Sequence, residues 1–516
     1  MNQVIQQYGQ QARQAAAARD WRSVKQLAAQ MLAMQKNNAD GWFLMGLSSL
    51  AVGNRQAALQ EFSKALQYDG QRYDAAIELA ALNWQSGQHL RALDLLTRYE
   101  TYLSASPKYS FLAAETYTRL GLHEKAWSHY DATNELQKNA PNIQAQLAAC
   151  STKVGKVALA IELYDKLLAL NPHHQRNHYE RARLETATNT NRIEAMQASL
   201  TTTGLSPEKN IFMNYAIGKE YEDIGDWQSA FEYYKAGGDA AHKQCLNAGY
   251  SVQQDVELID SIMENCTASW ISKTKRSAKG AKQPIFVVGL PRTGTTLVEK
   301  IISSHSLIGT ADESFFLEMA IKRASGLQSI NEVSPSMIKA ACLNTGANIA
   351  DDYLNAVSYR VYDQPNFVEK YPFNFLYIGF IARHFPNSKI VLLKRNAMDA
   401  CFAMYKQPFF KFSYTLEGLA HYHNAYVRLI EHWRSTVPNL IEIDYETLVR
   451  DPEPCIRGLM SDLEFEFESA CVNYHLNSSP SATASSVQVL DKPHTRSVEK
   501  WRNWETELQS LTVNLS

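Results

Sequence analysis

Glycines recur at a fixed spacing through the first half of the chain, and this period restricts the fold more than any other feature. Four glycines lie 34 residues apart, and an alanine follows each of them by five positions. A glycine at this place ends one helix in the left-handed conformation, and a small alanine lets the next helix pack closely. The period therefore predicts a stack of helical hairpins, none of which buries its apolar face alone. The pairs are Gly53 and Ala58, Gly87 and Ala92, Gly121 and Ala126, and Gly155 and Ala160.

Weaker copies flank these four units. One period before Gly53 lie Arg19 and Val24. After the fourth unit, "NTNRIEAMQ" supplies Ala195 and "IGDWQSAFEYY" supplies Gly225 and Ala230, each about one residue out of phase. The unit "GWFLMGLSSLAVGNRQAALQEFSKALQYD" resembles the tetratricopeptide repeat. This resemblance implies an all-α tetratricopeptide-repeat superhelix whose concave face recruits a peptide, a protein acceptor or another protein partner.

The composition changes in the second half of the chain. We expect the repeat array to occupy residues 1–240 and a connecting helix with the basic linker "ISKTKRSAKGAKQP" to occupy residues 241–283. In residues 284–516, the short apolar runs "PIFVVGL", "SKIVLLKRN" and "NLIEIDY" are each followed by a helical pattern. This alternation predicts an α/β, P-loop-like domain with a central parallel sheet, in which ligands bind beyond the carboxyl ends of the strands.

The first predicted strand leads into the glycine turn "GLPRTGTTL". Gly289, Gly294 and Thr296 keep the spacing G-x-x-x-x-G-K-[ST] of a nucleotide phosphate loop, but position 295 is threonine instead of lysine. The missing lysine, with no acidic metal motif after any strand, favours one 5′-phosphate group bound without a metal. We expect an anion to be bound at the start of the following helix by Arg292, Thr293, Gly294, Thr295, Thr296 and Leu297.

A second anion site is predicted in "KIVLLKRNAMDACFAMY". Lys394 and Arg395 end a predicted strand and open a helix, which is again a place that favours phosphate. Two separate phosphate sites in one domain indicate a nucleotide that carries phosphate at both its 5′ and 3′ positions.

The two segments together resemble a known family. "PIFVVGLPRTGTTL" looks like the 5′-phosphosulfate loop of sulfotransferases, and "KIVLLKRNAMDACFAMY" looks like their 3′-phosphate motif. With its repeats, the chain is similar to bacterial tetratricopeptide-repeat sulfotransferases, and its catalytic half resembles the tyrosylprotein sulfotransferases. The resemblance implies that 3′-phosphoadenosine 5′-phosphosulfate (PAPS) donates a sulfuryl group to an acceptor hydroxyl, with 3′-phosphoadenosine 5′-phosphate as the product and without a metal. A protein tyrosine is one candidate acceptor, and another peptide- or polymer-linked hydroxyl is the other.

The resemblance also implies roles for five residues outside the loop. Glu313 in "GTADESFF" matches the catalytic base, and Lys370 in "VEKYPFNF" matches a lysine that stabilises charge in the transition state. Ser485 in "TASSVQV" matches a serine near the donor. Tyr445 matches a tyrosine near the adenosine, and Lys500 in "EKWRNW" matches a phosphate-binding lysine.

The 3′-phosphate motif departs from the family at two positions. The family usually has a serine eight residues after its arginine, but the residue eight positions after Arg395 is Ala403, and Ala397 stands where a proline is usual. Loss of a hydroxyl hydrogen bond to a charged phosphate costs about 1.5–3 kcal/mol unless another group replaces it. Ala403 therefore predicts either weaker donor binding or a compensating group.

Composition excludes some classes of function and leaves others open. The formal net charge of −2 gives no global basic field for nucleic acid or a membrane. The chain shows no apolar signal-peptide core near its start and no run long enough to span a membrane, and its seven cysteines form no C-x-x-C pair. We expect a cytoplasmic enzyme whose oligomeric state the sequence does not fix, with a dimer as one option. The alternatives are a non-catalytic repeat scaffold with a degenerate PAPS-binding domain and, less favoured, a P-loop kinase.

Overall fold

A computed structural model describes residues 2–138, 140–203, 209–273, 282–327, 332–361, 364–477 and 492–515. Its contacts divide the chain into two compact units, Met1–Cys150 and Ser151–Ser516. The domain boundaries expected from the sequence, at residues 240 and 284, stay a prediction. Across the described ranges, no helix combines the length and the apolar composition that crossing a membrane requires.

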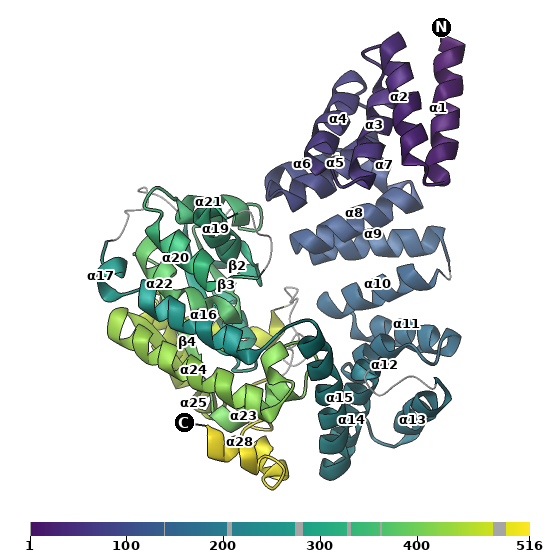
Figure 1. Ribbon diagram of the computed structural model, residues 1–516. Coiled ribbons are helices and arrows are strands. Elements are labelled where there is room, and N and C mark those ends of the chain that lie inside the picture. The colour runs from purple at the N-terminus through teal and green to yellow at the C-terminus, as the bar shows by residue number, and fades with distance from the viewer. Residues whose placement is uncertain are drawn as a thin grey trace. The chain divides into compact units, whose positions relative to one another are not determined.

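The first part of the chain is built from helices that pack in successive pairs, drawn from purple to teal in Figure 1. The pairs α1–α2, α3–α4, α5–α6, α8–α9 and α14–α15 each consist of two helices that are joined by a short turn and pack against one another, as the sequence period predicts. The helices are α1 (Asn2–Ala17), α2 (Trp21–Met34), α3 (Ala39–Ala51), α4 (Arg55–Tyr68), α5 (Tyr73–Gln85), α6 (His89–Arg98), α7 (Glu100–Ser104), α8 (Pro107–Leu120), α9 (His123–Leu136), α10 (Pro141–Lys153), α11 (Val157–Leu170), α12 (Gln175–Ala182), α13 (Asn191–Thr203), α14 (Ile211–Ile224) and α15 (Trp227–Asn247).

The periodic residues take the places that the sequence predicts. Gly121 ends α8 with φ of 76°, and its N–H donates to the carbonyl groups at the end of that helix, as a left-handed cap does. Arg19, at the equivalent position of the first unit, also has a positive φ of 59°. The predicted close-packing residues Val24, Ala58, Ala92, Ala126, Ala160 and Ala230 are all fully buried.

The sixth unit differs from the prediction at one position. Ala195, which the spacing places at the close-packing position of α13, is exposed, whereas Ile193 and Met196 are buried. The reason is that this copy is out of phase with the period: Ile193 and Met196, three positions apart, form the buried face of α13, and Ala195 lies off that face. The prediction for Ala195 is therefore wrong, although the helix α13 itself is present.

The second half contains a five-stranded sheet in which every neighbouring pair is parallel. Its strands are β1 (Gln283–Val288), β2 (Ile308–Asp312), β3 (Asn366–Lys370), β4 (Lys389–Lys394) and β5 (Leu440–Asp444), in the order β2-β3-β1-β4-β5. The central strand β1 sets Val287 beside Lys370 of β3 and beside Val391 of β4. The strands therefore end at one edge, where Gly289, Arg395 and Tyr445 follow them. The predicted parallel α/β architecture is confirmed.

Helices surround this sheet, in teal, green and yellow in Figure 1. They are α16 (Val252–Asn265), α17 (Ala268–Ile271), α18 (Thr295–Ser303), α19 (Phe316–Ser325), α20 (Pro335–Leu343), α21 (Ile349–Val357), α22 (Ile378–His384), α23 (Ala397–Tyr405), α24 (Leu416–Thr436), α25 (Tyr445–Arg450), α26 (Pro452–Asp462), α27 (Ser469–Val472) and α28 (Gln509–Asn514).

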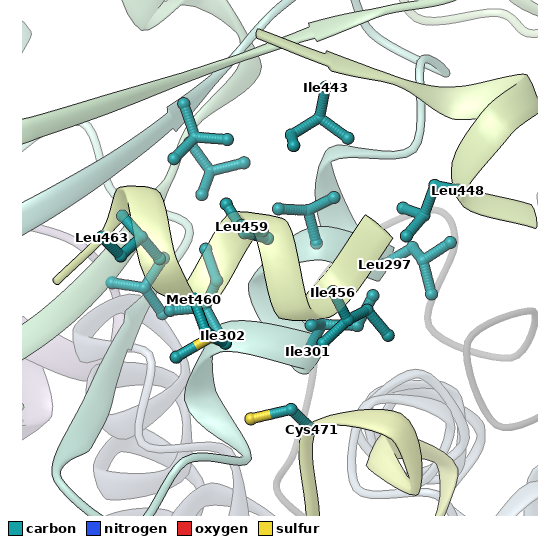
Figure 2. Close-up of a cluster of buried hydrophobic side chains, with 14 of the residues drawn as sticks. Leu297, Ile301, Ile302, Ile443, Leu448, Ile456, Leu459, Met460, Leu463 and Cys471 are labelled. Carbon is teal, nitrogen blue, oxygen red and sulfur yellow. The ribbon is translucent and has the colours of Figure 1, made fainter. Parts of the chain in front are cut away.

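One face of the sheet packs against α18 and α26. Figure 2 shows side chains of α26, among them Leu459 and Met460, lying against Ile301 and Ile302 of α18, with Ile443 of β5 above them. All of these side chains are almost completely shielded from water. Because α18 begins directly after the glycine turn, this apolar contact fixes the position of the turn at the edge of the sheet. On the opposite face, Phe286 of β1 packs against Tyr353 of α21 and against Phe385.

Candidate active site

The glycine turn between β1 and α18 takes a conformation that its sequence makes accessible. Gly289, Arg292 and Gly294 all have positive φ, at 149°, 69° and 97°. Gly294 is the N-cap of α18 and provides no side-chain cap, so the first N–H groups of the helix are directed to the space before it. Thr293 points the other way, since both its hydroxyl and its N–H donate to the carbonyl of Leu290. An anion at this turn would therefore meet the start of α18.

Gly294 also makes room for Tyr445. A Cβ atom at position 294 would lie 2.5 Å from the Tyr445 ring, which is closer than two carbon atoms approach without displacement. The Tyr445 hydroxyl is hydrogen-bonded to Ser497 Oγ at 2.8 Å, and the guanidinium of Arg395 lies 4.6 Å from the centre of the ring. Tyr445 thus joins the glycine turn to the end of β4, as expected for residues at the same sheet edge.

Arg395 is held by the backbone of two segments. Its two terminal nitrogens donate to the carbonyl of Arg292 at 2.6 Å and to that of Ser497 at 2.7 Å. Its Nε is buried and has no hydrogen-bond partner among the described residues. Burial, together with the positive charges of Arg395 and Arg183, lowers the pKa of Arg292 to about 10. Such a gathering of buried positive charge favours an anionic ligand.

These groups line one cavity of about 550 Å³. Its walls include the end of β4, the start of α25 and the segment 492–501, as well as residues of the repeat helices α12, α14 and α15. Tyr179 and Arg183 come from α12 and the residue that caps it, and Lys219 comes from α14. Thr293, Glu313 and Lys370 do not line the cavity. The residues predicted from the sequence that do are Arg292, Gly294, Thr295, Thr296, Leu297, Arg395, Tyr445 and Lys500.

Glu313 and Lys370 form a pair of their own at the same sheet edge. Lys370 Nζ donates to Glu313 Oε2 at 2.5 Å, and it lies 4.0 Å from Glu299 Oε2 on α18. The side chain of Lys370 is 1% exposed, whereas that of Glu313 is 28% exposed. Burial alone would lower the pKa of Lys370, but the neighbouring carboxylates of Glu313 and Glu299 outweigh it and raise the pKa. Lys370 is therefore a charged group inside the protein, and Glu313 is the partner that solvent reaches.

The backbone before Glu313 is bent. Asp312 has a positive φ of 54°, and the pairing of β2 with β3 shifts between Thr310 and Asp312. A bulge of this kind turns the end of a strand and redirects the side chain that follows. In this protein the bulge directly precedes Glu313, whose carboxylate accepts the hydrogen bond from Lys370. Glu299, which Thr310 Oγ1 contacts at 2.9 Å, has its pKa raised to about 7 by burial, against the opposing effect of Lys370.

Lys500 is part of a cluster that sequence reasoning found only in part. Its Nζ lies 2.6 Å from Glu222 Oε1 on α14, and Lys406 Nζ donates to both oxygens of the same carboxylate. The Tyr234 hydroxyl donates to Glu222 Oε2 at 2.8 Å. Burial alone would raise the pKa of Glu222, but Lys406 and Lys500 outweigh it and lower the pKa to about 2. Glu222 and Lys406 were not predicted from the sequence, although Lys406 follows Ala403 by one helical turn.

Asp399 fixes the segment that carries Lys500. Its two carboxylate oxygens accept hydrogen bonds from the backbone N–H groups of Glu499, at 2.6 Å, and of Trp501, at 3.2 Å. Ser485, the remaining predicted catalytic residue, lies outside the described residues. Within the described ranges, no group of three or more His, Cys, Asp or Glu side chains is arranged to hold a metal ion.

The fold is an α/β domain whose parallel strands end at one edge, where a glycine turn and arginine side chains lie together. Residues 284–469 match the model of the sulfotransferase family, and the helices of the repeat region precede this part of the chain. The geometry and the family match thus agree with the resemblance that the sequence motifs indicated.

Two curated relatives cover different shares of the chain. An uncharacterized protein of Aquifex aeolicus (strain VF5) is 28% identical over 393 residues, which are 73% of this chain and 51% of that protein. Protein-tyrosine sulfotransferase 1 of Danio rerio is 20% identical over 230 residues, which are 42% of this chain and 65% of that protein. The chain therefore spans about half of the first relative and less than two thirds of the second.

Two solved structures each match less than half of the chain. The sulfotransferase domain from the Synechococcus PCC 7002 olefin synthase is 18% identical, with a TM-score of 0.33, and covers 44% of this chain and 90% of its own length. A tetratricopeptide repeat protein from Parabacteroides merdae ATCC 43184 is 14% identical, with a TM-score of 0.32, and covers 48% of this chain and 94% of its own length. These two partial matches are similarities only.

Proposed function

We propose that this protein transfers the sulfuryl group of PAPS to the hydroxyl group of an acceptor. The observation that carries the proposal is the convergence of the glycine turn, Arg395 and Lys500 on one cavity at the carboxyl ends of the strands. The match of residues 284–469 to the sulfotransferase family supports it. The nucleotide-triphosphate alternative has less support, because Thr295 stands where such loops carry lysine.

The charge of the cavity fits a nucleotide with phosphate groups at two positions. The N–H groups at the start of α18, together with Arg292, Thr295 and Thr296, would hold the 5′-phosphosulfate. Arg395 and Lys500 would hold the 3′-phosphate, and Tyr445 would lie near the adenosine. Burial first, and then the nearby charges of Arg395 and Arg183, lower the pKa of Arg292, and an anionic donor would offset both costs of keeping this guanidinium charged. Thr293 contributes to the shape of the turn, because both of its donors are used inside it.

Glu313 and Lys370 are the groups that we assign to the chemistry. PAPS supplies a sulfuryl group whose bond to the 5′-phosphate oxygen breaks as a bond to the acceptor oxygen forms. Glu313 accepts the proton of the acceptor hydroxyl, and its partial exposure leaves it accessible to a substrate. Lys370 orients that carboxylate and provides a fixed positive charge for the oxyanion that develops. Ser485 keeps the role that the resemblance gives it, near the donor.

The acceptor is expected to be a peptide, a protein or a polymer that carries a hydroxyl group, with tyrosine as one candidate. The Danio rerio relative, named as a protein-tyrosine sulfotransferase, supports the tyrosine candidate. Repeat arrays commonly present a concave face to a peptide, and we assign recruitment of the acceptor or of a partner protein to the helix pairs. We keep the expectations of a cytoplasmic protein and of a dimer as one option.

Calorimetry with two nucleotides tests the proposal. Titration with 3′-phosphoadenosine 5′-phosphate should show binding in the absence of metal, whereas ATP with Mg²⁺ should show none of comparable strength. Binding of neither nucleotide would point to a repeat scaffold with a degenerate donor site. Selective binding of ATP with Mg²⁺ would point to a kinase, and either of these two results would overturn the proposal.

A further inference from the structure

We infer that Lys406, anchored by Glu222 of repeat helix α14, binds the 3′-phosphate of the donor in place of the hydroxyl that Ala403 lacks. This inference rests on the proposed function, because it assigns a ligand group to a residue of the same cavity. It makes Lys406 a specificity-determining residue, and it makes Glu222 a positioning residue contributed by the repeat region.

The positions of Lys406 and Ala403 carry the first part of the inference. They are three residues apart at the end of α23, so they share one face of that helix. Both line the cavity, together with Arg395 at the start of the same segment. A lysine side chain is long enough to bring a cation to the space beside a small residue one turn earlier. The group that could compensate for Ala403 is thus on the same helix face as the alanine.

The contacts of Lys406 show how its ammonium group is held. Its Nζ lies 2.8 and 2.9 Å from the two oxygens of Glu222, and it lies 5.1 Å from the ring centre of Phe402 and 5.3 Å from that of Trp504. The side chain of Lys406 is 16% exposed and that of Glu222 is 9% exposed. The aromatic rings and the carboxylate therefore confine a charged group at the cavity wall, so little side-chain freedom remains to be lost when a ligand binds.

The charge balance of the cluster favours an anion. Glu222 carries one negative charge, and both Lys406 and Lys500 are hydrogen-bonded to it. Two ammonium groups on one carboxylate leave an excess of positive charge. The cavity lining as a whole also has this sign, with eight Lys and Arg side chains against five Asp and Glu side chains. An ammonium group has three N–H donors, so one that binds Glu222 can also donate to a phosphate oxygen. A phosphate group would be a second anion beside the Glu222 carboxylate, and it would balance the remaining positive charge.

Calorimetry on the full chain tests this inference with a pair of ligands. 3′-Phosphoadenosine 5′-phosphate and adenosine 5′-phosphate differ only in the 3′-phosphate. In Lys406→Met, which keeps an unbranched apolar stem, affinity for the bisphosphate should fall about 10- to 100-fold, the range expected for a charged hydrogen bond. Affinity for adenosine 5′-phosphate should stay within about twofold. The added change Ala403→Ser should restore part of the lost bisphosphate affinity.

A matched control and a second variant separate a ligand role from a structural one. Lys389→Met removes a lysine that pairs with Glu464 at 2.6 Å outside the cavity, and it should leave both affinities unchanged. Glu222→Gln removes the anchor and should also weaken binding of the bisphosphate more than that of adenosine 5′-phosphate. If the Lys406→Met variant loses both affinities equally, or loses neither, Lys406 only ties α14 to α23 and the inference is overturned. If the unaltered protein binds neither nucleotide, the proposed function itself fails.

Discussion

Lys370 Nζ and Glu313 Oε2 lie 2.5 Å apart, although 57 residues separate them in the sequence. The pairing places a buried cation against a carboxylate that remains partly exposed. Because Lys370 ends β3, next to the strand that precedes the glycine turn, the pair belongs to the edge at which the donor is proposed to bind. The relationship supports the proposed division of roles, in which the exposed partner accepts the proton and the buried one stabilises charge.

Replacement of the proposed base should separate chemistry from donor binding. Glu313→Gln keeps the size of the side chain but removes its basicity, and it should reduce the rate of sulfuryl transfer about 10²- to 10⁴-fold. Affinity for 3′-phosphoadenosine 5′-phosphate, measured by calorimetry, should stay within about twofold of the original, because Glu313 does not line the cavity. Glu332→Gln is a matched control, since this exposed carboxylate pairs with Lys411 on the surface. An unaltered transfer rate in Glu313→Gln would refute the assignment.

The glycine turn should not tolerate a side chain at position 294. Gly294→Ala introduces a Cβ atom 2.5 Å from the Tyr445 ring at a residue whose φ is 97°. Strain of this kind costs about 1–3 kcal/mol, so binding of 3′-phosphoadenosine 5′-phosphate should weaken about 5- to 150-fold. Gly326→Ala is the control, because Gly326 also has a positive φ but a Cβ atom there meets no neighbour within 4 Å. Equal bisphosphate affinities in both variants would contradict the role given to the turn.

Restoring the family hydroxyl should strengthen donor binding. Ala403 lines the cavity, so Ala403→Ser places a hydroxyl group on the wall that Arg395 and Lys406 share. A new hydrogen bond to a phosphate should raise affinity for 3′-phosphoadenosine 5′-phosphate about 3- to 10-fold and leave that for adenosine 5′-phosphate unchanged. Calorimetry with both nucleotides measures the difference. If affinity for the bisphosphate does not change, the 3′-phosphate lies elsewhere.

A buried carboxylate should make stability depend on pH near neutrality. Burial raises the pKa of Glu369 to about 7 from 4.5, although hydrogen bonds from Tyr353, Ser314 and Asn374 oppose the change. The folded protein therefore holds this proton more tightly than the unfolded chain, so the contribution of Glu369 to stability falls as pH rises from 4.5 to about 7.

Glu369→Gln should remove this dependence. The difference in Tm, variant minus original protein, should be more positive at pH 8 than at pH 5. Thermal unfolding of both proteins at the two pH values measures this difference. Glu453→Gln, which changes an exposed carboxylate paired with Arg457, serves as the control. A relative Tm of Glu369→Gln that falls between pH 5 and pH 8 would have the wrong sign for a buried acid.

The sequence predicted local features well and long-range contacts poorly. The repeat glycines, the turn at Gly294 and the strand ends at Arg395 and Tyr445 depend on neighbours in sequence, and the structure places them as expected. Glu222 could not be assigned to the cavity from the sequence, because its place there depends on a contact with Lys406, which is 184 residues away. The 34-residue period gave no reason to single out Glu222, since this residue lies in a helix whose sequence pattern is that of an ordinary repeat. Lys406 had a local signal, its spacing from Ala403, which becomes informative only once the cavity is known.

The contact of Glu222 with Lys406 and Lys500 links the repeat helix α14 to the part of the chain that contains the sheet. A repeat helix contributes a carboxylate that is fully engaged by two lysines of the cavity. Removal of one member of such a buried group leaves the others uncompensated, at a cost of about 3–5 kcal/mol. We therefore expect the donor site to require α14 as well as the part of the chain that matches the sulfotransferase family.

Transfer of a labelled sulfuryl group tests the central claim most directly. The purified protein is incubated with PAPS labelled in its sulfuryl group and a cell lysate, and the labelled macromolecules are separated and identified by mass spectrometry. The account predicts label on a hydroxyl-bearing peptide, protein or polymer with the original protein, and almost none with Glu313→Gln. Label that appears equally with both proteins, or with neither while the original protein binds 3′-phosphoadenosine 5′-phosphate, would contradict it.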